Sequence, residues 1–111
     1  MEKLSAKRCV PCEGGTEKLS YEAAQTLLKG IAGWTLDTDG FSISKKYKFK
    51  NYYHTIAFVN MVAWISHQEN HHPDLVVNYN SCEIKYSTHS IGGLSENDFI
   101  CAAKINQLKI E

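Results

Sequence analysis

The sequence lacks an excess of charge of either sign and lacks a long hydrophobic run. Its 111 residues contain 12 Lys and Arg against 12 Asp and Glu, so there is no overall positive field to attract nucleic acid or an anionic membrane. No stretch reaches the roughly 18 uncharged apolar residues of a membrane helix, and residues 1–8 contain no apolar core of a secretory signal. We therefore expect one cytoplasmic domain that binds neither membrane nor nucleic acid directly.

Cysteine is too sparse to predict a disulfide framework. The chain has four cysteines, and without a secretory signal we expect them to be reduced. Cys9 and Cys12 form the only close pair in the sequence, but no second pair or paired histidines follow at zinc-ribbon spacing. Residues 1–18 contain Pro11 and two glycines without periodicity, which predicts an irregular surface arm followed by a single domain over residues 19–111.

Three segments have the apolar spacing of helices. Ser20 is a predicted N-cap of a short first helix. From Asn51, a second predicted cap, to about Asn70 there is no Gly or Pro, and apolar residues cover more than one stripe. A helix of this kind is expected to be buried on more than one side, as the central helix of the core. Ser95 begins a third helix, with Asp98 at the reciprocal position of a capping box.

Two pairs of segments alternate apolar and polar residues, as strands do. Residues 34–37 and 41–49 flank Asp39-Gly40, a dipeptide typical of a tight hairpin turn, and residues 75–79 and 82–86 form a second hairpin. The order helix, hairpin, long helix, hairpin, helix predicts an α+β fold, with a four-stranded antiparallel sheet and three helices packed on one face. The unpaired edges of so small a sheet favour a dimer.

Histidine is concentrated in one short stretch. Three of the five histidines, His67, His71 and His72, lie within six residues, and His89 follows at the end of the returning strand. On one helix face His67 and His71 could chelate zinc, but Gln follows His67 where the usual catalytic zinc motif has Glu. The alternative is metal-free acid–base catalysis, in which adjacent imidazoles suppress each other's protonation, so that one accepts a proton while another donates one.

The spacing of these residues resembles the signature of the pterin-4a-carbinolamine dehydratases. In that signature an acid, Lys or His precedes a His-His or His-Asn pair and a Pro, and then an aromatic residue, a His and an Asp follow at set spacings. The matching residues in this sequence are His67, His71, His72, Pro73, Tyr79, His89 and Asp98. The resemblance extends upstream to residues 12–15 and downstream to residues 93–95, so it covers nearly the whole chain.

The resemblance implies a small cytosolic enzyme that needs no metal and no cofactor. Members of the family remove water from 4a-hydroxytetrahydrobiopterin, the spent cofactor of aromatic amino-acid hydroxylases, and they assemble as homodimers or dimers of dimers. By position in the signature, the implied acid–base groups are His71, His72 and His89. The positions implied to bind the pterin are His67, Asn70, Leu75, Val76, Ser87, Thr88 and Asp98.

Some of these positions differ from animal members of the family. Those members have Glu in place of His67, Asp in place of Asn70, and a Trp-Phe pair in place of Leu75-Val76. We expect the differences to affect reaction rate, ring stacking and pterin preference rather than the class of reaction. Animal relatives also serve as dimerisation cofactors of a homeodomain transcription factor, so a binding module is one alternative to the dehydratase. The zinc site formed by His67 and His71 is the other.

Overall fold

Four strands form one antiparallel sheet in the order β1-β2-β4-β3. The computed structural model describes residues 3–10 and 18–109. The strands are β1 (Thr35–Leu36), β2 (Ile43–Lys48), β3 (Asp74–Asn78) and β4 (Ser81–Tyr86). Ile43 pairs with Tyr86, and Leu75 pairs with Ile84. Because paired residues point to the same side, these strands present one apolar surface to the core.

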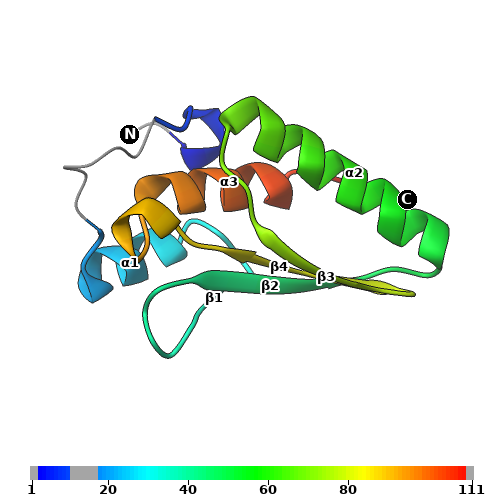
Figure 1. Ribbon diagram of the computed structural model, residues 1–111, viewed down its shortest axis with the longest axis horizontal. Helices are drawn as coiled ribbons and strands as arrows, with labels where there is room; N and C mark the ends of the chain where they lie inside the picture. Colours follow the sequence, from blue (N-terminus) through cyan, green and yellow to red (C-terminus); the bar gives the residue numbers. More distant parts are fainter. Residues whose placement is uncertain (1–2, 11–17, 110–111) are drawn as a thin grey trace.

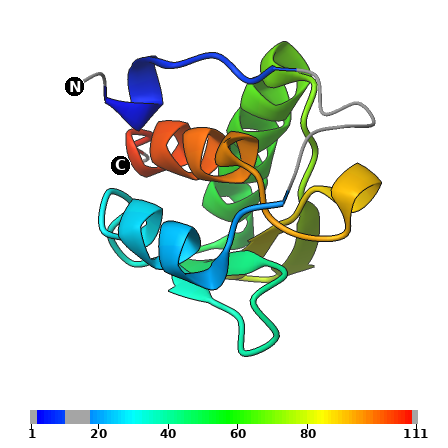
Figure 2. The same ribbon diagram turned by 90° about the vertical axis from the view of Figure 1, so that its left-hand side faces the viewer.

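Three helices cover one face of this sheet, which confirms the predicted fold class (Figure 1). They are α1 (Tyr21–Leu28), α2 (Tyr52–Glu69) and α3 (Glu96–Asn106), with short 3₁₀ turns η1 (Leu4–Ala6) and η2 (His89–Ile91). The predicted caps are confirmed: Ser20 and Asn51 accept from backbone amides of α1 and α2, and Ser95 and Asp98 form a capping box at the start of α3. Figure 2 shows α3 lying between α1 and α2.

The long helix α2 is not the central helix of the core. It buries one face, formed by Thr55, Phe58, Val62, Ser66 and Glu69, whereas Trp64 on another face is 61% exposed. The prediction of burial on more than one side is therefore wrong within this chain. The central place belongs to α3, in which every residue from 97 to 103 is buried.

The first hairpin has a longer turn than the sequence predicted. The Asp37 N–H donates to the Ser42 carbonyl and the Gly40 N–H donates to the Asp37 carbonyl, so residues 38–41 connect the strands. Gly40 has a φ of 75°, a conformation that glycine adopts without strain. The hairpin is confirmed, but the prediction of a tight two-residue turn at Asp39-Gly40 is wrong. In the second hairpin Asn78 pairs with Ser81, which puts the turn one residue earlier than predicted.

The described part of the N-terminal arm packs on the core. Leu4 and Cys9 are partly buried against it, and residues 4–6 form the 3₁₀ turn η1. The prediction of an arm without regular structure is therefore wrong for those residues. Cys12 lies outside the described residues, so the expectation that its thiol is reduced stays a prediction. Within residues 3–10 and 18–109, no helix combines the length and the apolar character that crossing a membrane requires.

Candidate active site

A pocket of about 570 Å³ lies where α2 ends, β4 ends and η2 begins. This volume is within the usual range for small-molecule sites. His71 and His72 line it from the segment that follows α2, and His89 lines it from η2. Asn70, Ser87 and Thr88 also line it. The pocket therefore brings together all three predicted acid–base histidines and three of the predicted pterin-binding residues.

The end of α2 directs the histidine pair out of the helix. Asn70 caps the helix in the left-handed conformation, with a φ of 52°, which asparagine tolerates better than most residues. The His71 N–H donates to the Ser66 carbonyl at 3.0 Å. Pro73 then precedes β3 and favours an extended conformation for His72. This turn places two consecutive imidazoles at the pocket.

His71 is paired with a buried carboxylate. Its Nε2 lies 2.6 Å from Asp98 Oδ1, and the Asp98 side chain is fully buried. Asp98 Oδ2 accepts from the Thr88 hydroxyl at 2.8 Å and from the Ser95 N–H at 2.9 Å. A carboxylate that already accepts two hydrogen bonds requires a donor as its third partner, so we assign a proton to His71 Nε2. The other ring nitrogen, Nδ1, is then the atom of His71 available to exchange a proton.

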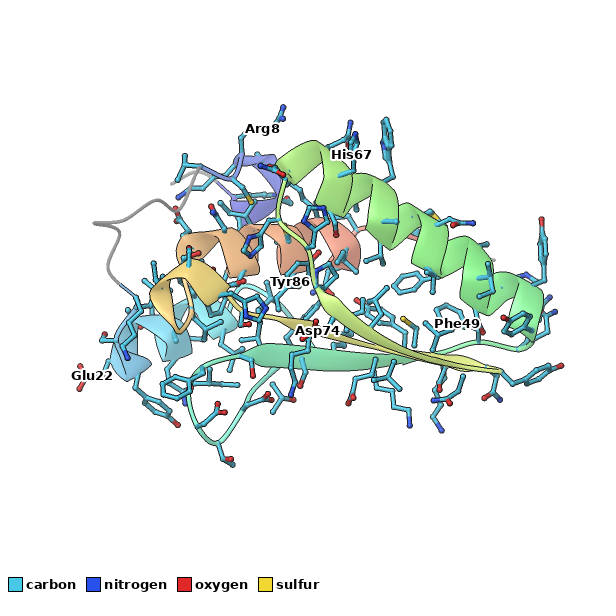
Figure 3. All side chains as sticks on the ribbon, in the orientation of Figure 1. Arg8, Glu22, Phe49, His67, Asp74 and Tyr86 are labelled. Carbon is cyan, nitrogen blue, oxygen red and sulfur yellow. The ribbon has the colours of Figure 1, made fainter. Side chains whose placement is uncertain are left out.

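The His71 ring is also held by an aromatic side chain. It stacks on Tyr86 of β4, with ring centroids 5.6 Å apart and an angle of 6° between the planes. Tyr86 lies between the sheet and the helices (Figure 3), and its hydroxyl is 2.9 Å from that of Ser66. Burial raises the pKa of Tyr86 well above its usual range, so this phenol stays neutral. The stack and the carboxylate together fix the orientation of His71.

His72 and His89 have a different environment from His71. Both are exposed residues at the rim of the pocket, whereas the side chain of His71 is only 11% exposed. The site therefore combines one imidazole fixed by a buried acid with two that are open to water. Such an arrangement places imidazoles in two different environments around one pocket, which suits proton transfer to and from a bound ligand.

Four predicted pterin-binding residues are not among the described residues that line the pocket. His67 lies on the outer side of α2, with its ring 6.1 Å from that of Trp64 (Figure 3). Leu75 packs partly against the core, and Val76 is 55% exposed on β3. Asp98 is the fourth, and it contacts the pocket indirectly, through the lining residues His71 and Thr88. The roles of His67, Leu75 and Val76 in binding stay predictions.

The geometry of α2 does not support a zinc pair of His67 and His71. The helix ends at Glu69, so His71 lies beyond the left-handed Asn70 and does not share a helix face with His67. Within the described ranges, no group of three or more His, Cys, Asp or Glu side chains is arranged to hold a metal ion. The zinc hypothesis assumed that His67 and His71 share a helix face, and that assumption is wrong.

The sequence did not identify several residues of the pocket. Cys9 and Val10 of the N-terminal arm line it, together with Glu69 and Asn97. The Glu69 side chain is 5% exposed and meets Arg8 at 3.2 Å and Lys104 at 3.4 Å. No motif or spacing connects these positions, because they are brought together only by the packing of the arm on α2 and α3.

We expect Glu69 to stabilise the fold in a pH-dependent way. Burial alone would raise its pKa, but the Cys9 N–H and the charges of Lys104 and Arg8 outweigh burial and hold the pKa of Glu69 below its ordinary value of 4.5. Its contribution is therefore complete above that value and is lost as the pH falls through the lower, folded-state pKa. Glu69→Gln should lower Tm most near neutral pH, and the difference from the unaltered protein should shrink in acid.

Thermal unfolding of both proteins from about pH 7 to about pH 3 measures this difference. Glu83→Gln, at an exposed position on β4, is the matched control and should leave the profile unchanged. A Tm difference for Glu69→Gln that stays constant across the range would contradict the assignment.

Sequence comparisons relate the chain to one family over nearly all of its length. A family model described as Pterin 4 alpha carbinolamine dehydratase matches residues 17–108. A protein of Nitrosomonas eutropha is 57% identical over 108 residues, which cover 96% of this chain and 94% of that protein. A protein of Dechloromonas aromatica is 52% identical over 105 residues, covering 95% and 92%. Both carry, provisionally, the name pterin-4-alpha-carbinolamine dehydratase.

Solved structures share the fold. A transcriptional coactivator/pterin dehydratase from Brucella melitensis superposes with a TM-score of 0.77 at 27% identity, covering 81% of this chain and 96% of that one. A pterin dehydratase-like protein, described as a RuBisCO assembly factor in the alpha-carboxysome, superposes with a TM-score of 0.58 at 20% identity, covering 67% and 86%. The second likeness, at that identity, concerns the fold alone.

Proposed function

Because the chain belongs to the pterin-4-alpha-carbinolamine dehydratase family, we propose that it removes water from 4a-hydroxytetrahydrobiopterin to give quinonoid dihydropterin. The reaction breaks the C4a–O bond and the N5–H bond of the pterin, forms a C4a=N5 double bond and releases water. It requires a proton donor for the leaving hydroxyl and an acceptor for the N5 proton. It requires neither a nucleophile nor an electron carrier.

We assign the acceptor role to His71. When its Nδ1 takes a proton the ring becomes an imidazolium, and the buried Asp98 carboxylate 2.6 Å from Nε2 stabilises that positive charge. His72 and His89, at the water-exposed rim, supply the proton to the leaving hydroxyl. The observation that carries the proposal is the presence of these three imidazoles around one pocket, with one of them fixed by a buried acid.

The rest of the pocket suits a flat, polar ring. Asn70 and Ser87 line it with hydrogen-bonding groups, which match the donors and acceptors along the edge of a pterin. The predicted contacts of His67, Leu75 and Val76 belong to the same proposal. The product is reduced elsewhere to tetrahydropterin, so the enzyme would recycle the cofactor of an aromatic amino-acid hydroxylase in the cytoplasm.

We also propose that the enzyme is a homodimer or a dimer of dimers. β3 is an edge strand, and on it Val76 and Val77 are 55% and 39% exposed, as is Tyr79, at 64%, in the following turn. An exposed apolar edge strand favours pairing with another chain. Sedimentation should give two or four times the mass of one chain, and a monomer at micromolar concentration would contradict this proposal.

A direct turnover assay tests the proposed activity. The carbinolamine is generated in situ by a pterin-dependent hydroxylase, and formation of the quinonoid product is followed by its absorbance with and without the purified, chelator-treated chain. We expect acceleration over the uncatalysed dehydration, with no loss after chelation. A rate equal to that of the buffer control would contradict the dehydratase, and stoichiometric zinc needed for activity would contradict the metal-free mechanism.

A further inference from the structure

One wall of the pocket comes from the N-terminal arm. Cys9 and Val10 line the pocket together with His71, His72 and His89, although they lie about sixty residues or more before these histidines in the sequence. We call residues 8–10 the arm segment. Its contacts decide whether this wall is a fixed part of the site or a loose cover.

Asn97, in the first turn of α3, holds the arm segment by its backbone. The Val10 N–H donates to Asn97 Oδ1 at 3.0 Å, and Asn97 Nδ2 donates to the Val10 carbonyl at 2.6 Å. The Asn97 side chain thus pairs with both backbone groups of Val10, much as a neighbouring strand would. Asn97 is 5% exposed whereas Val10 is 65% exposed, so the pair ties an exposed residue of the arm segment to a buried amide.

The end of α2 supplies a second support. The Cys9 N–H donates to Glu69 Oε1 at 2.8 Å, and Arg8 Nε meets Glu69 Oε2 at 3.2 Å. Cys9 Sγ lies 3.7 Å from Cys101 Sγ and 3.6 Å from the Asn97 carbonyl. The arm segment is therefore held against the end of α2 and the start of α3.

The first turn of α3 positions two different parts of the site. Asp98 fixes His71 on one side, and its neighbour Asn97 fixes the arm segment on the other. These two functions can be separated, because the Asn97 amide contacts the arm segment and the Asp98 carboxylate contacts His71. Loss of the first should alter how well substrate is held, and loss of the second should alter the chemistry.

We propose that the arm segment is a wall of the substrate pocket, and that Asn97 is a positioning residue that holds this wall closed and so sets the affinity for the pterin. The proposal rests on the dehydratase function proposed above. A pterin bound against a wall that is open for part of the time has a weakened apparent affinity, in proportion to the closed fraction. The acid–base groups are unaffected, so KM changes and kcat does not.

Steady-state kinetics of Asn97→Ala test the proposal. We expect KM to rise roughly three- to tenfold, the scale of one or two lost hydrogen bonds, with kcat within about twofold of the unaltered enzyme. Asn106→Ala is the matched control on the same helix: it removes bonds from Trp34, Lys45 and Tyr47 and should lower Tm without raising KM. Equal KM values in Asn97→Ala and the unaltered enzyme, or a fall in kcat alone, would overturn the proposal.

The Cys9 thiol reports on the arm segment without any turnover. The neighbouring Cys101 thiol and burial hold the pKa of Cys9 above its ordinary value, so alkylation by iodoacetamide should be slow, because the thiolate is the reactive form. Peptide mass mapping distinguishes Cys9 from the other cysteines. We expect alkylation of Cys9 to accelerate about tenfold or more in Asn97→Ala, and Asn106→Ala to leave it unchanged.

A stable dihydropterin without the 4a-hydroxyl gives the same information on the unaltered protein. At saturation it should slow Cys9 alkylation, because it occupies the pocket that Cys9 lines. If the alkylation rate of Cys9 changes neither with this ligand nor in Asn97→Ala, the proposal that the arm segment is a wall of the pocket is overturned. If the chain binds the dihydropterin and protects Cys9 but does not dehydrate the carbinolamine, the proposed activity fails while the wall stands.

Discussion

Replacing His71 or His72 by alanine should lower kcat on the order of 10²-fold or more, the usual scale for loss of a general acid or base. Each change removes one imidazole from the pocket. Water must then either accept the N5 proton or donate a proton to the leaving hydroxyl. We expect the effect mainly in kcat, because the pterin keeps its other contacts. Stopped-flow or coupled turnover of the carbinolamine measures the loss against the uncatalysed rate.

His54→Ala is the matched control for both variants. His54 lies in the first turn of α2, where its Nδ1 is 2.7 Å from the capping Asn51 side chain, and it is not among the described residues that line the pocket. Its loss should leave kcat unchanged. Full activity in both His71→Ala and His72→Ala would exclude histidine catalysis in this pocket.

Asp98→Asn should also lower kcat on the order of 10²-fold or more, although Asp98 does not itself line the pocket. The amide has nearly the same size as the carboxylate, but its NH₂ group can only donate. When this NH₂ group donates to His71 Nε2, it favours the tautomer that carries the proton on Nδ1. Nδ1 can then no longer accept the proton from the pterin. The amide also carries no negative charge to stabilise the imidazolium.

Two further variants test whether this loss acts through His71. In the double variant Asp98→Asn, His71→Ala, the losses in kcat should not multiply, because both changes disable the same imidazole. Asp74→Asn, at an exposed position at the start of β3, should leave kcat unchanged. Independent, multiplying losses would mean that Asp98 acts through something other than His71.

The sequence predicts the fold well where local chemistry decides it. Ser20, Asn51 and Ser95 are short polar residues before apolar periodic segments, and each of them caps a helix. The order of the elements is enough to derive the sheet, because two hairpins and three helices of these lengths have few ways to pack. What local chemistry does not decide is which apolar surface is covered.

The exposed side of α2 illustrates that limit. Trp64 and Tyr53 extend the apolar surface of the helix, yet they are 61% and 78% exposed. An apolar stripe on a helix indicates that burial is favourable, but it does not say whether the same chain or another one provides the cover. The sequence therefore suggested a central helix, and the structure gives that place to α3.

The site was predictable as a set of residues but not as a set of contacts. The spacing of the histidines and Asp98 indicates the chemistry, yet the hydrogen bond between His71 and Asp98 joins residues 27 positions apart. The pairing of Val10 with Asn97 spans 87 positions. Such contacts depend on how α3 packs against the arm and against the end of α2, and no local pattern records that packing.

The five histidines report most directly on the proposed site. Imidazole ¹⁵N and ¹H NMR signals are followed while a stable dihydropterin is added to the protein. A site built from these three imidazoles predicts that the signals of His71, His72 and His89 shift at saturation, that His71 is protonated on Nε2, and that His54 does not respond. Saturable binding that leaves the signals of His71, His72 and His89 unmoved would contradict it.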